Sequence, residues 1–428
     1  MDFLLTGIVF VLICLLGYVP SCLVKSWVNP VSIFVFVWGL NLVVFCFVKA
    51  MFVEVTMETW LILSIAFFAF YSASISFLIP ICNGRWLQRD LGSSDRISSL
   101  RGGINKKRMR FAIYFLIFGG GIFFVCYLIL LVQLQGFKEI FFTLLSTRAY
   151  MKEEGVLLGF HFFYFWEMLL PLMVLYILVF GKNKEAIVMS VVVVVLTFCL
   201  LLTGAKTNIY KAFVWSFVLY SLLKYENIKF QSLSLVVGFT ILAGVGFFFI
   251  YTGFTKELQG FSNQGREVIY RFSAQFPTFH SLINDSSVSH SYGKLLFLPV
   301  TKLAHIFIPE IQTPSHILEF YDVPLSFNLA TYLDVFYKDF GLIGVVLFPW
   351  LFGIVSAYIF YVYTVNKRSF FVLFIMSIIL LWIMESSNAS GFIKPDYWFQ
   401  IIFGYVMYLF VRVKKPLTGD TYKMRDLP

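Results

Sequence analysis

The sequence predicts an all-α polytopic membrane protein with about eleven transmembrane helices and one large outer loop. Hydrophobic residues make up 60% of the 428 residues and charged residues only 13%, whereas soluble domains average about 45–50% apolar and about 25% charged residues. Phenylalanine occurs 53 times, which is more than a soluble core could bury. The net charge of +10 does not indicate a nucleic-acid partner, because the inner loops of membrane proteins are basic.

The expected spans follow from the length of apolar sequence that crosses a bilayer, which is about 20 residues. The first segment lacks a basic start and a small-residue cleavage site, so we expect a retained helix and no signal peptide. The shortest segments leave a total of about ten to twelve spans open. The segments are 3–19, 31–49, 59–80, 111–133, 160–180, 186–203, 208–223, 232–251, 341–364, 370–386 and 398–412.

Lys and Arg predict the orientation of these spans. Segment 81–110 holds eight basic residues and only two acidic ones, so we expect a cytoplasmic loop. Alternation then places the N-terminus outside and the C-terminus in the cytoplasm. With this topology 20 basic and 6 acidic residues lie inside, giving +14. The other 13 basic and 17 acidic residues give −4, which together make the +10 of the chain.

Residues 252–340 form the expected outer loop. Its 89 residues exceed an ordinary connection, and loops of that length are usually functional or disordered. Aromatic and aliphatic residues throughout favour a functional loop. The apolar run 295–308 is too short to span, so we expect it to lie in the interface or to re-enter, interrupted by Pro299.

Arginine in this loop is the first candidate for chemistry, because its planar fork matches phosphate oxygens. In GREVIYRF (265–272), a helix would place Arg266 and Tyr270 on one face and Glu267 and Arg271 on another. Arg266 would then face an anionic ligand while Glu267 orients Arg271. The alternative is a Glu267–Arg271 pair that only stabilises the helix.

Three further residues stand out between the basic loop and the outer loop. Arg148 lies in the amphipathic outer segment 135–159, whose alternative role is anchoring in the interface. Lys206 follows a turn at the outer end of a helix pair, where it could bind a ligand. Its alternative role is to extend its ammonium group to the lipid headgroups. Glu167 lies within an expected span, and an intramembrane carboxylate is a functional candidate unless it only joins two helices.

The stretch 326–344 carries polar residues into the next span, with Asn328, Asp334, Lys338 and Asp339. Asp334 and Lys338 are four residues apart and could simply pair. Asp334 and Asp339 are five apart, so they diverge on a helix and do not form a dyad. The chain contains no DxD, HExxH or CxxC motif, so we expect neither a catalytic metal nor a cofactor.

Taken together, these residues resemble the bacterial O-antigen polymerase (Wzy) family of oligosaccharide repeat unit polymerases. The resemblance covers most of the chain: the number of spans, the turn LTGAKTNIYK, and the late outer loop with GREVIYRF, an IPE/TP stretch and FNLATYLDVFYKDFGLIGVVLFPWLFG. Arg148, ten residues and Gly159 also fit an Arg-x10-Gly pattern of some members. The chain departs from the family at Lys206, where Arg is expected.

The resemblance implies a GT-C-like, metal-independent glycosyltransferase of a bacterial cytoplasmic (inner) membrane. It would transfer the growing glycan from undecaprenyl diphosphate to the next lipid-linked repeat unit at the outer face, and it leaves open whether a chain-length regulator binds. The catalytic candidates are Arg266, Arg271, Asp334, His280 and Asp339. The candidates for substrate binding are Arg148, Lys206, Glu167, Tyr270, Asn328 and Lys338.

Three other functions remain open on the sequence. A flippase for the same lipid-linked unit should have evenly short loops and charges inside the bundle. An O-antigen ligase has a very similar plan, with an outer loop that holds Arg and His. A membrane O-acyltransferase requires a histidine deep in the membrane, and no histidine lies deep in an expected span.

Overall fold

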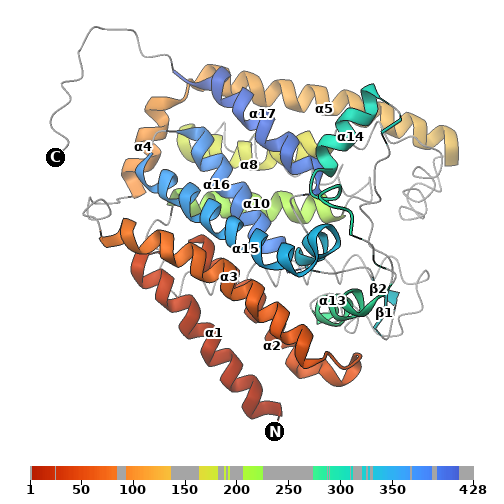
Figure 1. Cartoon of the computed structure of the whole chain (residues 1–428). Coiled ribbons are helices and arrows are strands. Elements are labelled where there is room, and N and C mark those ends of the chain that lie inside the picture. The colour runs from red at the N-terminus through yellow and green to blue at the C-terminus, as the bar shows by residue number, and fades with distance from the viewer. Residues whose placement is uncertain are drawn as a thin grey trace.

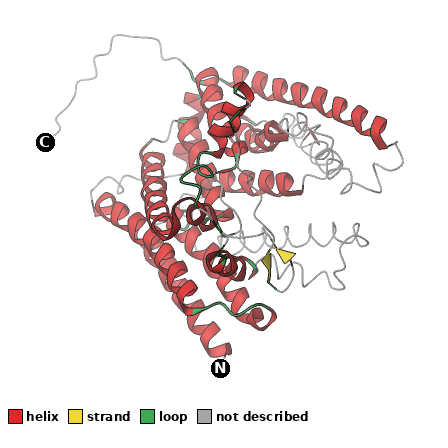
Figure 2. Cartoon of the chain, turned by 45° about the vertical axis from the view of Figure 1, so that its right-hand side comes forward, coloured by secondary structure: helices red, strands yellow, loops and turns green. Residues whose placement is uncertain are grey.

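The fold is mainly helical (Figure 2). The only strands in the described part are the two-residue β1 (Tyr321–Asp322) and β2 (Ser326–Phe327), which pair antiparallel. The computed structural model describes residues 2–24, 26–83, 93–135, 163–181, 188, 191–192, 206–224, 273–286, 288, 290–308, 310–311, 321–323, 326–327, 331–366, 369–387 and 393–413.

Nine described helices coincide with expected spans, and their apolar character indicates a membrane-embedded protein. Five contain stretches that are long and apolar enough to cross a membrane (α1, α2, α3, α5 and α15), and the other four contain shorter apolar stretches. The expected spans 186–203 and 232–251 lie almost entirely outside the described residues. The nine are α1 (Asp2–Val24), α2 (Pro30–Val48), α3 (Met57–Asn83), α5 (Lys106–Gln135), α8 (Phe163–Phe180), α10 (Lys206–Lys224), α15 (Leu333–Val365), α16 (Phe370–Glu385) and α17 (Pro395–Val411).

Small residues bring α3 and α15 close together. Ser74 Oγ of α3 donates to the Gly353 carbonyl of α15 at 3.0 Å. A Cβ at Gly353 would lie 2.6 Å from the Phe70 carbonyl oxygen, so only glycine allows this approach. The Phe70 ring also stacks on Phe34 of α2, with the ring centroids 4.0 Å apart. Because lipid is as apolar as these side chains, such close packing stabilises helix pairs in membranes.

The helix α15 begins eight residues before the expected span and breaks where that span was expected to start. Gly341 has φ +62° and ψ −148°, a conformation that glycine adopts without strain. A Cβ at Gly341 would lie 3.2 Å from the His290 ring, so the break also makes room for that imidazole. Hydropathy locates only the apolar part of such a helix, which explains why the expected span starts later than α15 does.

At one end of the bundle a short helix, α4 (Ser93–Gly103), covers the ends of longer helices (Figure 1). Arg96 Nη2 donates to the Tyr363 carbonyl in the last turn of α15 at 3.0 Å, and its guanidinium lies 3.7 Å from the centre of the Tyr363 ring. Arg101 Nε donates to the Val179 carbonyl in the last turn of α8 at 2.9 Å. These arginines satisfy carbonyls that have no partner within their own helices and complement the negative helix end.

The opposite end carries α13 (Gln275–Asn284), α14 (Leu298–Phe307) and the strands (Figure 1). Gln275 Nε2 of α13 donates to Asn41 Oδ1 of α2 at 2.8 Å, and Asn41 Nδ2 donates to Ser387 Oγ at 3.1 Å, directly after α16. This buried chain of amides and a hydroxyl fixes α13 on the bundle, because each donor would otherwise be left without a partner.

Helix α14 corrects one expectation. Pro299 does not interrupt the run 295–308 but lies in the first turn of α14, where its fixed φ suits a helix and its missing N–H is not needed.

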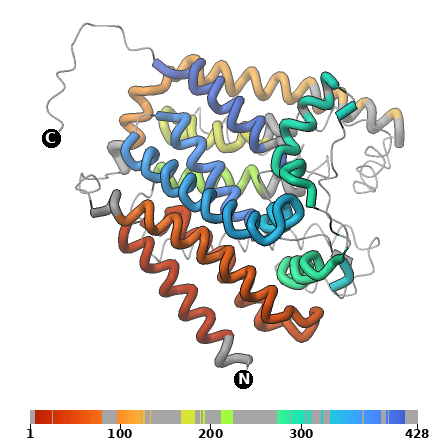
Figure 3. Tube along the Cα trace, in the orientation of Figure 1, coloured from red at the N-terminus to blue at the C-terminus, as the bar shows by residue number. Residues whose placement is uncertain are grey.

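The path of the chain brings α17 alongside α5, although most of the sequence separates the two helices (Figure 3).

Candidate functional site

Six polar residues gather where α8, α10 and α17 begin and α16 ends. This is the end of the bundle that carries α13, since Ser387, two residues after α16, bonds to the Asn41 amide that also holds Gln275. We call this group the polar cluster. Its members are Glu167 (α8), Lys211 (α10), Glu385 (α16), Lys394, Tyr397 and Gln400 (the last two on α17).

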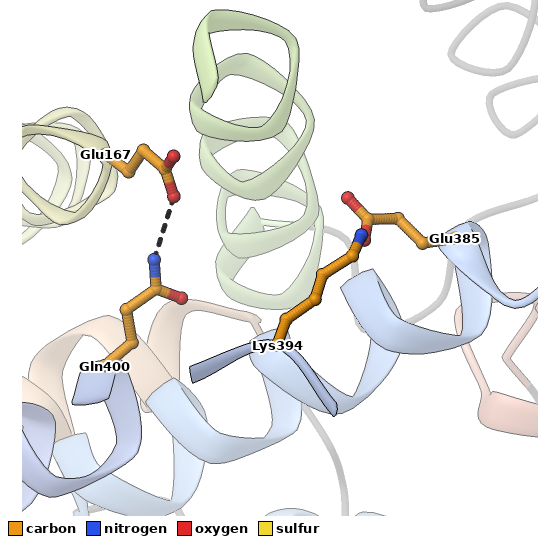
Figure 4. A network of polar contacts seen from close by, with 4 residues as sticks. All are labelled: Glu167, Glu385, Lys394 and Gln400. Atoms are coloured by element: carbon orange, nitrogen blue, oxygen red, sulfur yellow. Dashed lines mark hydrogen bonds and ion pairs between the residues drawn. The ribbon is translucent and has the colours of Figure 1, made fainter. Parts of the chain in front are cut away.

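An ion pair between Glu385 and Lys394 joins the end of α16 to the start of α17. Lys394 Nζ lies 2.8 Å from Glu385 Oε2, with 27% and 12% of the side chains exposed (Figure 4). Glu385 is the last residue of α16 and Lys394 the residue before α17. Glu385 therefore lies at the negative end of the α16 dipole, and Lys394 lies at the positive end of the α17 dipole. Each charge is unfavourable at the end of its own helix. Pairing offsets this, because each ion also lies beside the opposite end of the neighbouring helix.

A second cation lies deeper in the same group. Lys211 is 4% exposed, and its Nζ lies 4.8 Å from the centre of the Tyr397 ring, which is itself fully buried. Lys394 Nζ lies 6.0 Å from the same ring. A ring face stabilises a desolvated ammonium by about 2 kcal/mol or more. Tyr397 thus holds two ammonium groups on one aromatic ring at the end of apolar helices.

The other two members of the cluster, Glu167 and Gln400, form a hydrogen bond between a carboxylate and an amide. Gln400 Nε2 of α17 donates to Glu167 Oε2 of α8 at 3.0 Å, and both side chains are 1% exposed (Figure 4). Gln400 Oε1 is buried and accepts no hydrogen bond in the described part of the chain. A buried acceptor without a donor costs about 1–3 kcal/mol. A hydroxyl group of a ligand would satisfy this oxygen.

The polar cluster contains two carboxylates and two ammonium groups among apolar helices. Breaking such a buried pair is costly, and replacing it by apolar residues is often neutral or stabilising, so stability alone does not explain its presence. Intramembrane ions usually mark sites for substrates, ions or protons. Chemically, the cluster can offer ammonium groups to an anion and a carboxylate and an amide to hydroxyl groups.

His280 lies apart from this cluster, on α13. Its Nδ1 lies 2.8 Å from Thr59 Oγ1 of α3 and 2.9 Å from Asn284 Nδ2. Burial lowers the pKa of His280 from 6.5, because desolvation penalises the imidazolium. The neutral ring thus fastens α13 to α3.

Asp339 of α15 holds the turn that precedes α14. It is fully buried and accepts hydrogen bonds from Ser291 Oγ, from Leu295 N at 3.2 Å and from Leu296 N at 2.7 Å. These donors order the turn before α14 and attach it to α15. Both oxygens of this carboxylate accept hydrogen bonds from the turn, which suits an anchor better than a general base.

Asp334 and Lys338 occupy the first two turns of α15, and Asp334 is 4% exposed. The alternative role of the two residues, a simple charge pair, is not excluded: Lys338 interacts electrostatically with Asp334, although no ion pair within 4.0 Å joins them in the described part of the chain. No hydrogen bond links either residue, or His280 or Asp339, to the polar cluster within the described ranges. The expected site residues on α13 and α15 are thus separate from Glu167.

Several expected site residues lie outside the described residues. Lys206 begins α10, but its side chain is outside the described part, and Lys211 lies just over one turn further. The roles of the others stay predictions. They are Arg148, Arg266, Tyr270, Arg271 and Asn328.

Sequence reasoning selected Glu167 as a site residue but not the other five members of the cluster: Lys211, Glu385, Lys394, Tyr397 and Gln400. One signal was available, since ESSNASGFIKPDY (385–397) places a Glu and a Lys at the facing ends of two apolar runs. What the sequence could not show is that α8 and α10 bring Glu167 and Lys211 to the same place. No protein-family model, curated protein or solved structure matches this chain.

Proposed function

We propose that the chain is a multi-pass protein of a bacterial cytoplasmic membrane, with about eleven spans in a GT-C-like arrangement. In this proposal the α4 end of the bundle faces the cytoplasm and the α13 end faces outward. The distribution of charge supports the orientation, because the basic segment 93–110 lies at the α4 end and inner ends of spans are rich in Lys and Arg.

The proposed activity is polymerisation of lipid-linked oligosaccharide repeat units. The observation that carries it is the polar cluster, which lies among apolar helices at the same end of the bundle as α13 and α14. A polyprenyl diphosphate sugar has an apolar tail, a charged diphosphate and hydroxyl groups. A site between membrane helices that contains ammonium groups, an amide and a carboxylate meets each of these requirements.

The reaction needs no oxidant or further co-reactant. A hydroxyl oxygen of the acceptor unit forms a bond to the anomeric carbon of the growing glycan, and the bond from that carbon to the diphosphate oxygen breaks. Undecaprenyl diphosphate leaves with the electron pair, and the hydroxyl proton passes to a base. We assign the base to Glu167 and contacts to the diphosphate to Lys211 and Lys394, because cations stabilise the charge that develops there.

The outer arginines complete the proposal. Arg266 and Arg271 would contact the same diphosphate with two donors each. Gln400 would accept a hydrogen bond from a sugar hydroxyl through Oε1, which has no donor among the described residues.

Glycan analysis of a deletion strain complemented with variants tests this function. Glu167→Gln keeps the shape of the side chain and a hydrogen-bonding partner for Gln400, and it removes the base. We expect single repeat units in place of polymer, at normal protein levels. Lys294→Gln is the matched control, because Lys294 is an exposed residue on the α13 side of the bundle and should leave chain length normal. Normal polymer from Glu167→Gln would contradict the assignment of the base.

One observation favours a second candidate, a flippase for the same lipid-linked unit. The Glu385–Lys394 pair and Lys211 place charges between helices, as expected for that function. The two functions differ in what a deletion leaves behind. Loss of a polymerase leaves single repeat units exported to the outer face, whereas loss of a flippase leaves no repeat unit outside.

A further inference from the structure

Four of the exposed cations of the described residues lie at the α4 end of the bundle, far from the polar cluster. They come from the end of α4, the first turn of α5 and the residue after α17. We call this surface the basic patch. It consists of Arg101, Lys107, Arg108 and Arg412.

Backbone hydrogen bonds bring these distant parts of the chain together. Asn105 N donates to the Val411 carbonyl at 2.7 Å, and Val413 N donates to the Gly103 carbonyl at 3.1 Å. The connection between α4 and α5 thus pairs with the end of α17. The patch is a built feature of the fold, since it needs segments about 300 residues apart.

The stretches of chain that carry the patch contain no acidic residue after Asp95 at the start of α4. Neither 96–135 nor 401–413 includes an Asp or a Glu. Like charges held together repel one another, and an external anion would relieve this repulsion. The patch therefore fits an anionic ligand.

Two of the four cations are fixed in position before any ligand binds. Arg101 Nε donates to the Val179 carbonyl at 2.9 Å, and Arg108 Nη1 donates to the Phe410 carbonyl at 3.2 Å. Each guanidinium has five N–H donors, so one hydrogen bond to a helix end leaves the others for a ligand. A side chain already held in place loses less entropy when it binds an anion.

An apolar surface begins directly beside the patch. On α5, six exposed residues recur at alternating spacings of four and three, which places them on one face of the helix. Phe410 of α17 extends this surface, with its ring centroid 6.1 Å from that of Phe111. The stripe starts one turn after Lys107 and Arg108 and comprises Phe111, Phe115, Phe118, Ile122, Val125 and Ile129.

We propose that the basic patch binds the phosphate headgroup of one anionic phospholipid, whose acyl chains lie along the apolar stripe of α5. The basic patch would contact the headgroup, and the apolar stripe that begins beside it would contact the acyl chains in the order in which they follow the headgroup. Basic pockets beside membrane helices are suited to anionic headgroups. The proposal is independent of the glycosyl transfer proposed above, because the patch lies at the other end of the bundle.

Titration of lipid into the purified full-length chain in detergent, followed by native mass spectrometry, tests the proposal. The probes are dioleoyl phosphatidylglycerol, dioleoyl phosphatidylcholine and inorganic phosphate. The patch variant is Lys107→Gln with Arg412→Gln. The matched control, Lys49→Gln with Lys294→Gln, removes the same charge from exposed positions at the other end of the bundle.

We expect the wild-type chain and the control to prefer phosphatidylglycerol over phosphatidylcholine. The patch variant should bind phosphatidylglycerol about 25-fold more weakly, since each cation near a membrane surface contributes about fivefold. If the double variant does not fold, Lys107→Gln alone should show the fivefold loss, because the Lys107 side chain makes no hydrogen bond in the described structure.

Three results would overturn the proposal. Equal affinity of wild type and patch variant for phosphatidylglycerol would show that these cations do not bind the headgroup. Equal affinity of the wild-type chain for both lipids would show that the patch only orients the protein in the membrane. Displacement of phosphatidylglycerol by inorganic phosphate at similar concentration would assign the patch to a soluble anion.

Discussion

Exchanging the two charges of the Glu385–Lys394 pair separates what this pair does for stability from what it does for function. Glu385→Gln or Lys394→Gln alone leaves one ion without its partner. Breaking a fully buried pair costs about 3–5 kcal/mol, and breaking an exposed one costs about 1 kcal/mol or less. With side chains 12% and 27% exposed, we expect a loss of about 2–3 kcal/mol in the free energy of unfolding for each single variant.

The exchanged variant, Glu385→Lys with Lys394→Glu, restores the pair. It also places a cation at the C-terminal end of α16 and an anion at the N-terminal end of α17, which both helix dipoles favour. A cation at position 385 would, however, be repelled by Lys211, which attracts Glu385 in the wild-type chain. We therefore expect stability between that of the single variants and that of wild type, as measured by equilibrium unfolding in mixed micelles followed by tryptophan fluorescence. Polymer formation should nevertheless be lost, because the ammonium group has moved away from the proposed diphosphate position.

Two results would refute this reasoning. If the exchanged variant is as unstable as the single variants, the attraction between positions 385 and 394 does not stabilise the fold and other contacts, such as those with Lys211, determine the stability. If it is stable and makes polymer of normal length, the position of the Lys394 ammonium does not matter for the reaction. The variant with both residues changed to Gln is the control, since it removes both charges of the pair while the Lys211 ammonium stays in place.

Four further predictions test the topology, the site and the environment of a histidine. A cysteine introduced at the exposed Ser286 should react with impermeant maleimide in intact cells and one at Ser94 should not; reversed labelling would contradict the orientation. Arg266→Ala should leave single repeat units and Arg266→Lys should shorten the polymer, because Lys keeps the charge but loses the two-point contact; normal polymer from both Arg266→Ala and Arg271→Ala would exclude these residues from the site. Activity in nanodiscs should survive EDTA, and a loss restored by Mg²⁺ would show a metal requirement. The pKa of His280 is lower in the folded chain than its unfolded value of 6.5, so the unfolded state binds more protons and stability should fall as pH drops below about 6.5; His280→Gln should reduce this dependence, and an unchanged profile would assign it to other groups.

The sequence predicts the helices better than it predicts their ends. Apolar runs of about 20 residues identified nine helices, because bilayer thickness imposes that length. The start of α15 was missed because its first turns are polar, and the break at Gly341 depends on a backbone angle. Glycine is too common in membrane helices for its presence alone to indicate a break.

The candidate site was only partly predictable, for a physical reason. Glu167 stood out because a carboxylate within a span is costly. Glu385 and Lys394 did not, because each lies at the end of a span, where charges are ordinary. Their significance comes from helix packing, which brings the ends of α16 and α17 beside Lys211 of α10. Such proximity is a property of the folded bundle and leaves no periodic pattern in the sequence.

The pairing between the start of α5 and the end of α17 has a consequence for the biogenesis of the protein. Arg108 donates to the Phe410 carbonyl, and Asn105 N donates to the Val411 carbonyl. The partners of these groups are synthesised about 300 residues later. During translation, the basic end of α5 must therefore remain in water or among headgroups until α17 has emerged and inserted. Closure of this end of the bundle is a late step in membrane assembly, and a chain truncated before α17 lacks the carbonyls needed to complete it.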